Sequence, residues 1–151
     1  VYLNSLGVEP LRTSMGRVIV HLHGKPSDSK MKGLIEHYLV RTKSKVKVQY
    51  HDSKLSGMEY VSRLPSNTIF LDEGGDEFSS VQFSKKFEAW SLDSDDTNLA
   101  IGPPDGFPKD IFNPKISLSK MTFPHELAAV FLMEQLYRAD EIIRGSSYHR
   151  H

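Results

Sequence analysis

The chain contains 151 residues, enough for one domain with a hydrophobic core but too few for two. Lysine and arginine total 19, as do aspartate and glutamate, so the net charge is zero and nucleic-acid binding would need a local patch, a preassembled partner surface or a symmetric dimer groove. Cysteine is absent, which excludes disulfides, thiolate catalysis and cysteine-ligated zinc, and no apolar run approaches the roughly 20 residues that span a membrane.

The N-terminal residues are predicted to form an extension ahead of a single domain. Residues 1–16 show no clear hydrophobic period, and the domain is expected at 17–151. The chain begins with Val1 instead of methionine, and no signal-peptide pattern is visible. The extension slightly favours an organellar location, in a mitochondrion or plastid, over a cytoplasmic one.

Residues up to 66 predict two strands on either side of a helix. Residues 17–22 are rich in β-branched side chains and form the first expected strand. Asp28 or Ser29 can cap the helix that follows, in which apolar residues recur at helical spacing. Residues 45–50 alternate polar and apolar side chains, which predicts a second strand, and 51–66 are expected to form a polar connection.

The next segment predicts a central strand followed by a turn and a helix. Residues 68–71 are apolar enough for a buried strand, and the acidic residues 72–76 are expected to turn. Ser79 or Ser80 can cap a helix with an aromatic stripe along one side. That stripe comprises Phe83, Phe87 and Trp90.

The remaining residues predict two more strands and a long final helix. Residues 98–101 form a strand that ends at the proline-containing loop 102–106, and 115–119 form a short fifth strand. Pro124 suits the first turn of the last helix, and Gly145 suits the position after its end. The alternation of strands and helices predicts an α/β fold with a mostly parallel sheet flanked by helices.

Three groups of residues have ordinary structural explanations. His21 and His23 lie on one face of a strand, but no third metal ligand accompanies them, so no metal site is predicted. The acidic run 72–77 is expected to be a solvated turn instead of a magnesium site. The aromatic stripe is expected to pack in the core or at a dimer interface.

The C-terminal third contains three motifs in a recognisable order. They are Leu118-Ser-Lys-Met-Thr-Phe-Pro-His125, Glu134-Gln-Leu-Tyr-Arg-Ala139 and Tyr148-His-Arg150. Upstream, Leu71-Asp72, Ser79-Ser80 and Ile101-Gly102 fall in the same order and spacing as in one known family. Over about residues 17–150 the chain resembles the RlmH-type (SPOUT superfamily) pseudouridine N3-methyltransferases of large-subunit rRNA.

The resemblance implies a C-terminal deep trefoil knot, a homodimer, and S-adenosyl-L-methionine as the methyl donor. It also implies that large-subunit rRNA or the assembled ribosome is the partner. The cofactor-binding residues implied by the motifs are Leu71, Gly102, Leu118, Ser119, Lys120, Met121, Thr122 and Phe123. The implied catalytic and substrate-side residues are Arg138 and the tail residues Tyr148, His149 and Arg150, and the resemblance implies that this tail reaches the active site at the dimer interface.

Methyl transfer from a sulfonium requires mainly that donor and acceptor be positioned in line, because the donor is already activated. The N3–H group of pseudouridine must lose its proton before N3 can attack. Histidine ordinarily titrates near neutrality, so His149 is the candidate base. Arg138 or Arg150 is the candidate for stabilising the developing negative charge.

Several departures from the family pattern favour a second hypothesis. Pro103 replaces a glycine in the cofactor loop and removes an N–H group, and Gly75-Asp76 reverses a charge beside the cofactor cleft. The connection 51–66 is also shorter than usual. The alternative is therefore a catalytically retired protein that serves as a ribosome assembly factor or structural ribosomal component. A metabolic enzyme is disfavoured because no phosphate loop or nucleophile elbow is present.

Overall fold

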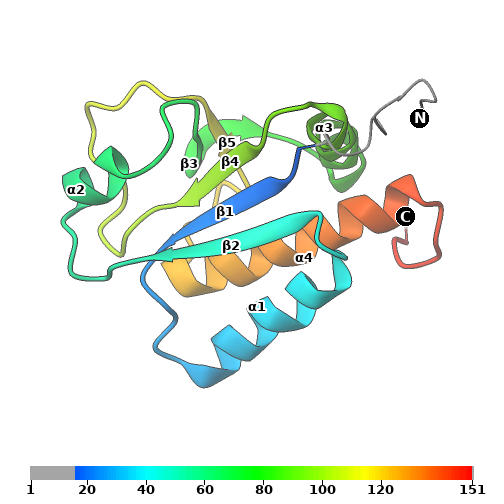
Figure 1. The fold of residues 1–151 in the computed structure, drawn as a ribbon, viewed down its shortest axis with the longest axis horizontal. Helices are drawn as coiled ribbons and strands as arrows, with labels where there is room; N and C mark the ends of the chain where they lie inside the picture. Colours follow the sequence, from blue (N-terminus) through cyan, green and yellow to red (C-terminus); the bar gives the residue numbers. More distant parts are fainter. Residues whose placement is uncertain (1–15, 151) are drawn as a thin grey trace, which may run out of the picture.

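The computed structural model describes residues 16–150, in which strands alternate with helices (Figure 1). The elements in order are β1 (Val18–His23), α1 (Ser29–Arg41), β2 (Val46–His51), α2 (Gly57–Ser62), β3 (Ile69–Glu77), α3 (Ser80–Leu92), β4 (Thr97–Ile101), β5 (Lys115–Ser117) and α4 (His125–Ile143). The five predicted strands and three predicted helices are confirmed. Residues 1–15 of the predicted extension and residue 151 lie outside the described residues, so the domain boundary and the organellar location stay predictions.

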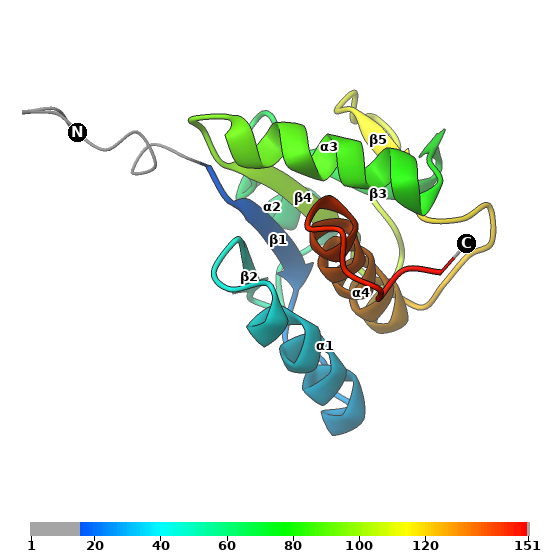
Figure 2. The same ribbon diagram turned by 90° about the vertical axis from the view of Figure 1, so that its right-hand side faces the viewer.

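The five strands form one sheet in the order β2-β1-β4-β3-β5, and every neighbouring pair is parallel. The predicted α/β fold is therefore confirmed, while the knot stays a prediction. Helices α1, α3 and α4 cover one face of the sheet, and the short α2 lies on the other (Figure 2). Within residues 16–150, none of the helices combines the length and apolar character needed to cross a membrane.

The main core lies between the sheet and the three helices on its covered face. Alternate β1 residues point into it, as expected for a strand with one buried face. Ile35 of α1 and Phe87 of α3 are buried there, and the predicted aromatic stripe packs in the same core, where Phe83 meets Trp90 edge-on at 5.8 Å. Fully buried side chains from the sheet and α4 include Val18, Val20, Leu99, Leu132, Met133 and Leu136.

Helix α2 interrupts the segment that was expected to be a connection, so that prediction is wrong for its six residues. A capping box starts the helix: Glu59 N–H donates to the Ser56 hydroxyl at 3.1 Å, and the Glu59 carboxylate accepts from Ser56 N–H at 2.9 Å. The Tyr60 side chain is completely buried, with its hydroxyl 2.7 Å from the Ile101 carbonyl oxygen and 3.1 Å from that of His21. Tyr60 thereby fixes α2 against the carboxyl ends of β1 and β4.

Strand β3 continues to Glu77, so the prediction of a turn at 72–76 is also wrong. After an irregularity, Asp76 pairs with Ile116 of β5 and Glu77 with Ser117. A Cβ atom on Gly75 would lie 2.6 Å from the Lys115 carbonyl carbon, so only glycine permits this close approach. The pairing fixes β5 beside β3 and sets where the segment after β5 begins.

A chain of polar side chains crosses the face of the sheet that α2 partly covers. His21 Nε2 lies 2.9 Å from Asn98 Oδ1, and His21 Nδ1 lies 2.9 Å from His51 Nε2. His23 instead bonds through Nε2 to the Leu55 carbonyl oxygen at 2.7 Å. Among residues 16–150, no group of three or more histidine, cysteine, aspartate or glutamate side chains is placed to hold a metal ion.

We expect acidification to destabilise the protein through the His21–His51 pair. Burial lowers the pKa of His21, and burial followed by the neighbouring charges of His21, Arg63 and His23 lowers that of His51. Because the unfolded chain binds these protons more readily, the free energy of unfolding should fall as the pH drops from about 7 to about 5. Urea unfolding across this range tests the expectation. A His21→Gln, His51→Gln variant should show a shallower pH dependence, whereas equal slopes in variant and wild type would contradict it.

Candidate active site

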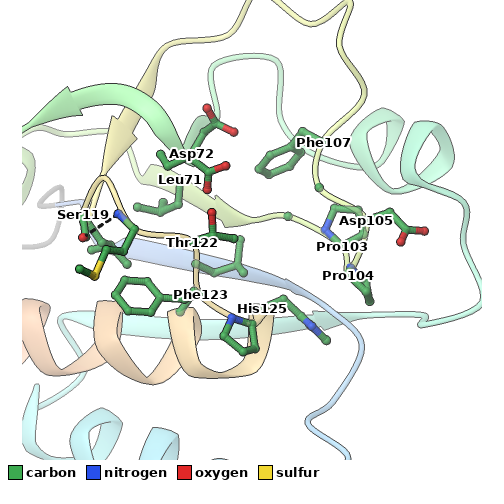
Figure 3. A pocket seen from close by; sticks show the side chains of 18 residues that line it. Leu71, Asp72, Pro103, Pro104, Asp105, Phe107, Ser119, Thr122, Phe123 and His125 are labelled. Carbon is green, nitrogen blue, oxygen red and sulfur yellow. Dashed lines mark hydrogen bonds between the residues drawn. The ribbon is translucent and has the colours of Figure 1, made fainter.

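A hollow of about 460 Å³ opens at the carboxyl end of β4 and beside the middle of β3 (Figure 3). Ligands of open parallel sheets usually bind at this edge, where strand ends meet loops. Four segments line the hollow: the middle of β3, the loop after β4, the segment after β5, and the first turn of α4. The lining residues are Leu71, Asp72, Glu73, Ile101, Gly102, Pro103, Pro104, Asp105, Gly106, Phe107, Leu118, Ser119, Met121, Thr122, Phe123, Pro124, His125 and Ala128.

The segment after β5 is shaped by two serine hydroxyls. Ser117 Oγ accepts from Ser119 N–H at 3.2 Å and donates to the Ser119 carbonyl at 2.7 Å, and Ser119 Oγ accepts from Met121 N–H at 3.0 Å. The chain therefore bends tightly before it enters α4. The bend presents Thr122 toward the hollow (Figure 3). The Phe123 ring packs on the Phe131 ring, with 5.3 Å between the ring centres.

The loop after β4 closes despite its two prolines. Gly106 N–H donates to the Pro103 carbonyl at 2.8 Å, and Gly106 adopts a φ of 82°, so 103–106 form a tight turn with Pro104 at its second position. Proline suits that position because its φ is already fixed. The Phe107 ring then stacks on Phe70 at 4.1 Å and closes one side of the hollow. Pro103 therefore changes the loop without filling the hollow.

Carboxylates form part of the rim. Asp72, Glu73 and Asp105 line the hollow, and Asp72 Oδ2 also accepts from Gly74 N–H at 2.9 Å. The interpretation of 72–77 as a solvated turn missed this placement. Asp76 is exposed and is not among the lining residues, so the charge reversal noted in the sequence lies away from the hollow.

Seven of the eight predicted cofactor-binding residues line this one hollow. The exception is Lys120, whose side chain is 85% exposed and whose Nζ lies 3.9 Å from Glu77 Oε1. Asp105, Phe107 and His125 also line the hollow, although the motifs did not predict a role for them there. Its position in the sequence could have indicated a role for His125, because it immediately precedes the helical pattern, where a strand-to-helix segment ends.

The predicted catalytic residues form a second group near the end of α4. Glu134 organises it, accepting from Arg138 Nη2 at 2.7 Å and from the Tyr148 hydroxyl at 2.8 Å. Arg138 Nη1 lies 3.0 Å from His149 Nδ1, and the guanidinium carbon lies 4.9 Å from the centre of the Tyr148 ring. Arg150 is exposed and forms no hydrogen bond or ion pair within residues 16–150.

These contacts set the hydrogen-bonding roles within the group and shift two of its pKa values. The hydrogen bond to Glu134 raises the pKa of Arg138, and burial followed by the bond to Glu134 raises that of Tyr148. Arginine only donates hydrogen bonds, so His149 Nδ1 accepts in this contact. The Nδ1 lone pair is therefore occupied by Arg138 in this conformation.

Comparison with known proteins identifies the fold family. Residues 17–149 match the model of the family described as "Predicted SPOUT methyltransferase". The chain belongs to the SPOUT methyltransferase family. Curated relatives are named "Ribosomal RNA large subunit methyltransferase H". The Maridesulfovibrio salexigens protein is 51% identical to this chain over 85 residues, which make up 54% of each chain. The Synechococcus sp. (strain CC9311) protein is 37% identical over 134 residues, which make up 84% of this chain and 92% of the relative. The chain thus spans about half the length of the first relative and most of the second.

In this SPOUT methyltransferase chain the two groups of candidate residues lie far apart. Arg138 follows His125 by 13 residues on one helix, which corresponds to about 20 Å along the axis. His125 lines the hollow, whereas Arg138 holds the tail. Residues from one chain therefore do not assemble both halves of the predicted site.

Proposed function

We propose that the protein is an S-adenosylmethionine-dependent methyltransferase that modifies N3 of pseudouridine in large-subunit rRNA, acting as a homodimer. The convergence of seven predicted cofactor residues on one hollow is the observation that supports this most directly. The names of the relatives support large-subunit rRNA as the substrate.

The hollow fits S-adenosylmethionine in size and chemistry. Its volume of about 460 Å³ lies within the range of roughly 300–1,000 Å³ typical of ligand sites. Leu71 and Phe107 offer apolar surfaces for an adenine ring, and the carboxylates of Asp72 and Asp105 complement a ligand with sulfonium and ammonium charges. When bound, the cofactor supplies an activated methyl group.

The chain's own residues would position the substrate and accept its proton. We assign His149 as the base for the N3 proton and Arg138 as the group that stabilises the resulting negative charge. Because Arg138 lies about 15 Å along α4 from Ala128, the lining residue of α4 that is nearest to it, the tail of a second copy would complete each site. Separation of His149 from Arg138 would release the lone pair needed for proton transfer.

A retired, noncatalytic ribosome factor is the second candidate. Pro103 and Pro104 remove two N–H donors from the wall of the hollow, which is the observation that favours it. The two candidates differ in cofactor binding, because only the enzyme requires it.

Calorimetric titration with S-adenosylmethionine and S-adenosylhomocysteine tests the proposal. We expect micromolar dissociation constants, equivalent to about −8 kcal/mol. Transfer of labelled methyl groups to large ribosomal subunits should follow, and subunits that lack pseudouridine should not be labelled. Absence of binding in a folded protein would reject the enzyme in favour of the noncatalytic factor.

Gly102→Val is expected to abolish measurable cofactor binding. A Cβ atom on Gly102 would already lie 3.2 Å from the Phe107 ring, and two further methyl groups would displace that ring or enter the hollow. We expect a loss of affinity of at least about 100-fold, and calorimetry measures it. Lys120→Ala is the matched control from the same site prediction, since Lys120 does not line the hollow. A larger loss in the control than in Gly102→Val would contradict this site.

A further inference from the structure

A second hollow, also of about 460 Å³, lies on the face of the sheet opposite α1, α3 and α4. Figure 1 looks onto this face, where α2 covers only the end near the tips of the strands. The hollow shares no lining residue with the candidate active site. We call it the basic groove, and define it by the cationic residues Arg17, Lys47 and Arg63 and the floor residues His21 and Asn98.

The basic groove concentrates positive charge in a chain whose net charge is zero. Asp96 is the only carboxylate among its described lining residues, and Asp96 Oδ2 lies 3.6 Å from Arg17 Nη2. Lys47 and Arg63 are exposed and form no ion pair within residues 16–150. A neighbouring hollow along the edge strand β2 shares Arg17 and Lys47 and adds Lys43. Four cationic side chains therefore follow one band of the surface.

The floor of the basic groove offers a fixed hydrogen-bond donor. His21 is buried, and its contacts with His51 and with Asn98 Oδ1, both 2.9 Å, hold the Asn98 amide in place. The Asn98 Nδ2 group makes no hydrogen bond within residues 16–150, although Asn98 is only 9% exposed. This donor is therefore available to an acceptor that enters the groove.

We propose that the basic groove binds the phosphate backbone of the RNA substrate at a surface separate from the methyl-transfer site. Its cations come from three segments of the chain: the start of β1, strand β2 and the end of α2. Their spread suits a row of phosphates better than one small anion, and phosphate contacts position a protein on nucleic acid. A concave surface also fits a nucleic-acid strand better than a flat lipid surface. The inference rests on the proposed function, which supplies RNA as the partner.

Charge reversal tests the basic groove, with Lys47→Glu, Arg63→Glu as the groove variant. The control is Lys30→Glu, Lys85→Glu, which changes the net charge equally at exposed lysines of α1 and α3 that form no ion pair within residues 16–150. Fluorescence anisotropy with a fluorescein-labelled RNA hairpin gives the dissociation constant at several salt concentrations. We expect the groove variant to bind at least about tenfold more weakly, with a salt dependence shallower by about 1.5 in log–log slope.

The control variant should remain within about threefold of wild type, since its charges lie away from the proposed contact. Both variants should bind S-adenosylmethionine like the wild type, which also shows that they are folded. If the charge-reversed groove variant is unfolded, Lys47→Gln, Arg63→Gln provides the same test with a smaller expected effect.

Equal RNA affinities of groove and control variants would overturn the proposal, as would a wild-type protein that fails to bind the hairpin. Binding to phosphatidylcholine–phosphatidylserine vesicles in place of RNA would overturn it in favour of a membrane contact. Methyl transfer to ribosomal subunits separates the two proposals. Activity that is independent of the groove rejects only the groove, whereas RNA binding without cofactor binding or methyl transfer rejects only the enzymatic function.

Discussion

Tyr60→Ala is expected to lower the free energy of unfolding by about 3–5 kcal/mol, the range for removing a large buried aromatic side chain. The Tyr60 ring has no exposed surface and meets the rings of His23 at 5.1 Å and His51 at 5.3 Å. It also lies parallel to Phe107 at 6.4 Å, so the cavity left by alanine would adjoin the cofactor loop. Urea unfolding monitored by circular dichroism measures the loss.

Tyr60→Phe separates the hydroxyl from the ring. Loss of the hydroxyl leaves the buried Ile101 carbonyl without this partner, which lowers the free energy of unfolding by about 1–3 kcal/mol. Because Gly102 follows Ile101 directly, we also expect weaker cofactor binding in this variant. Phe112→Ala is the control, since Phe112 is 96% exposed and its loss should change stability by no more than about 0.5 kcal/mol. Similar stabilities of Tyr60→Ala and the Phe112 control would contradict the role of Tyr60.

The fold was predictable where hydrophobic patterns were local. The caps at Asp28 and Ser79 are confirmed, because short side chains that accept from the first turn can be read from the sequence. The six residues of α2 were too few for a helical period, although the Ser56–Glu59 capping box was visible in the sequence. The polar end of β3 gave no strand pattern, since its structure depends on pairing with β5, about 40 residues later.

The candidate site was predictable from its motifs, but its geometry was not. The motifs predicted seven of the eighteen residues that line the hollow, while Phe107 and Asp105 became recognisable only once the loop had closed. The positive φ of Gly106, which follows the two prolines, became visible only in the structure. The basic groove was likewise hidden, because Arg17, Lys47 and Arg63 become neighbours only through the strand order and the position of α2.

The double variant Arg138→Ala, His149→Gln is expected to reduce methyl transfer by at least about 100-fold, the effect typical of losing an acid–base group. Its affinity for S-adenosylmethionine should not change, because neither residue lines the hollow. Single-turnover transfer to large ribosomal subunits measures the loss, and calorimetry provides the comparison. Arg150→Ala tests whether the exposed arginine shares the role of Arg138. Wild-type turnover in the double variant would reject both assignments.

Mixing this variant with Gly102→Val tests whether the tail acts on the partner's hollow. Each parent is expected to be inactive, one for lack of proton transfer and the other for lack of cofactor. If the tail of one copy serves the hollow of the other, a mixed dimer contains one hollow with both an intact lining and an intact tail. Random reassociation of equal amounts should then restore about a quarter of the wild-type activity.

If the tail served its own hollow, every site in the mixture would keep one defect and activity would stay lost. The separation of about 20 Å along α4 favours the first result, because a tail held against Glu134 and Arg138 cannot also lie beside His125 of its own chain.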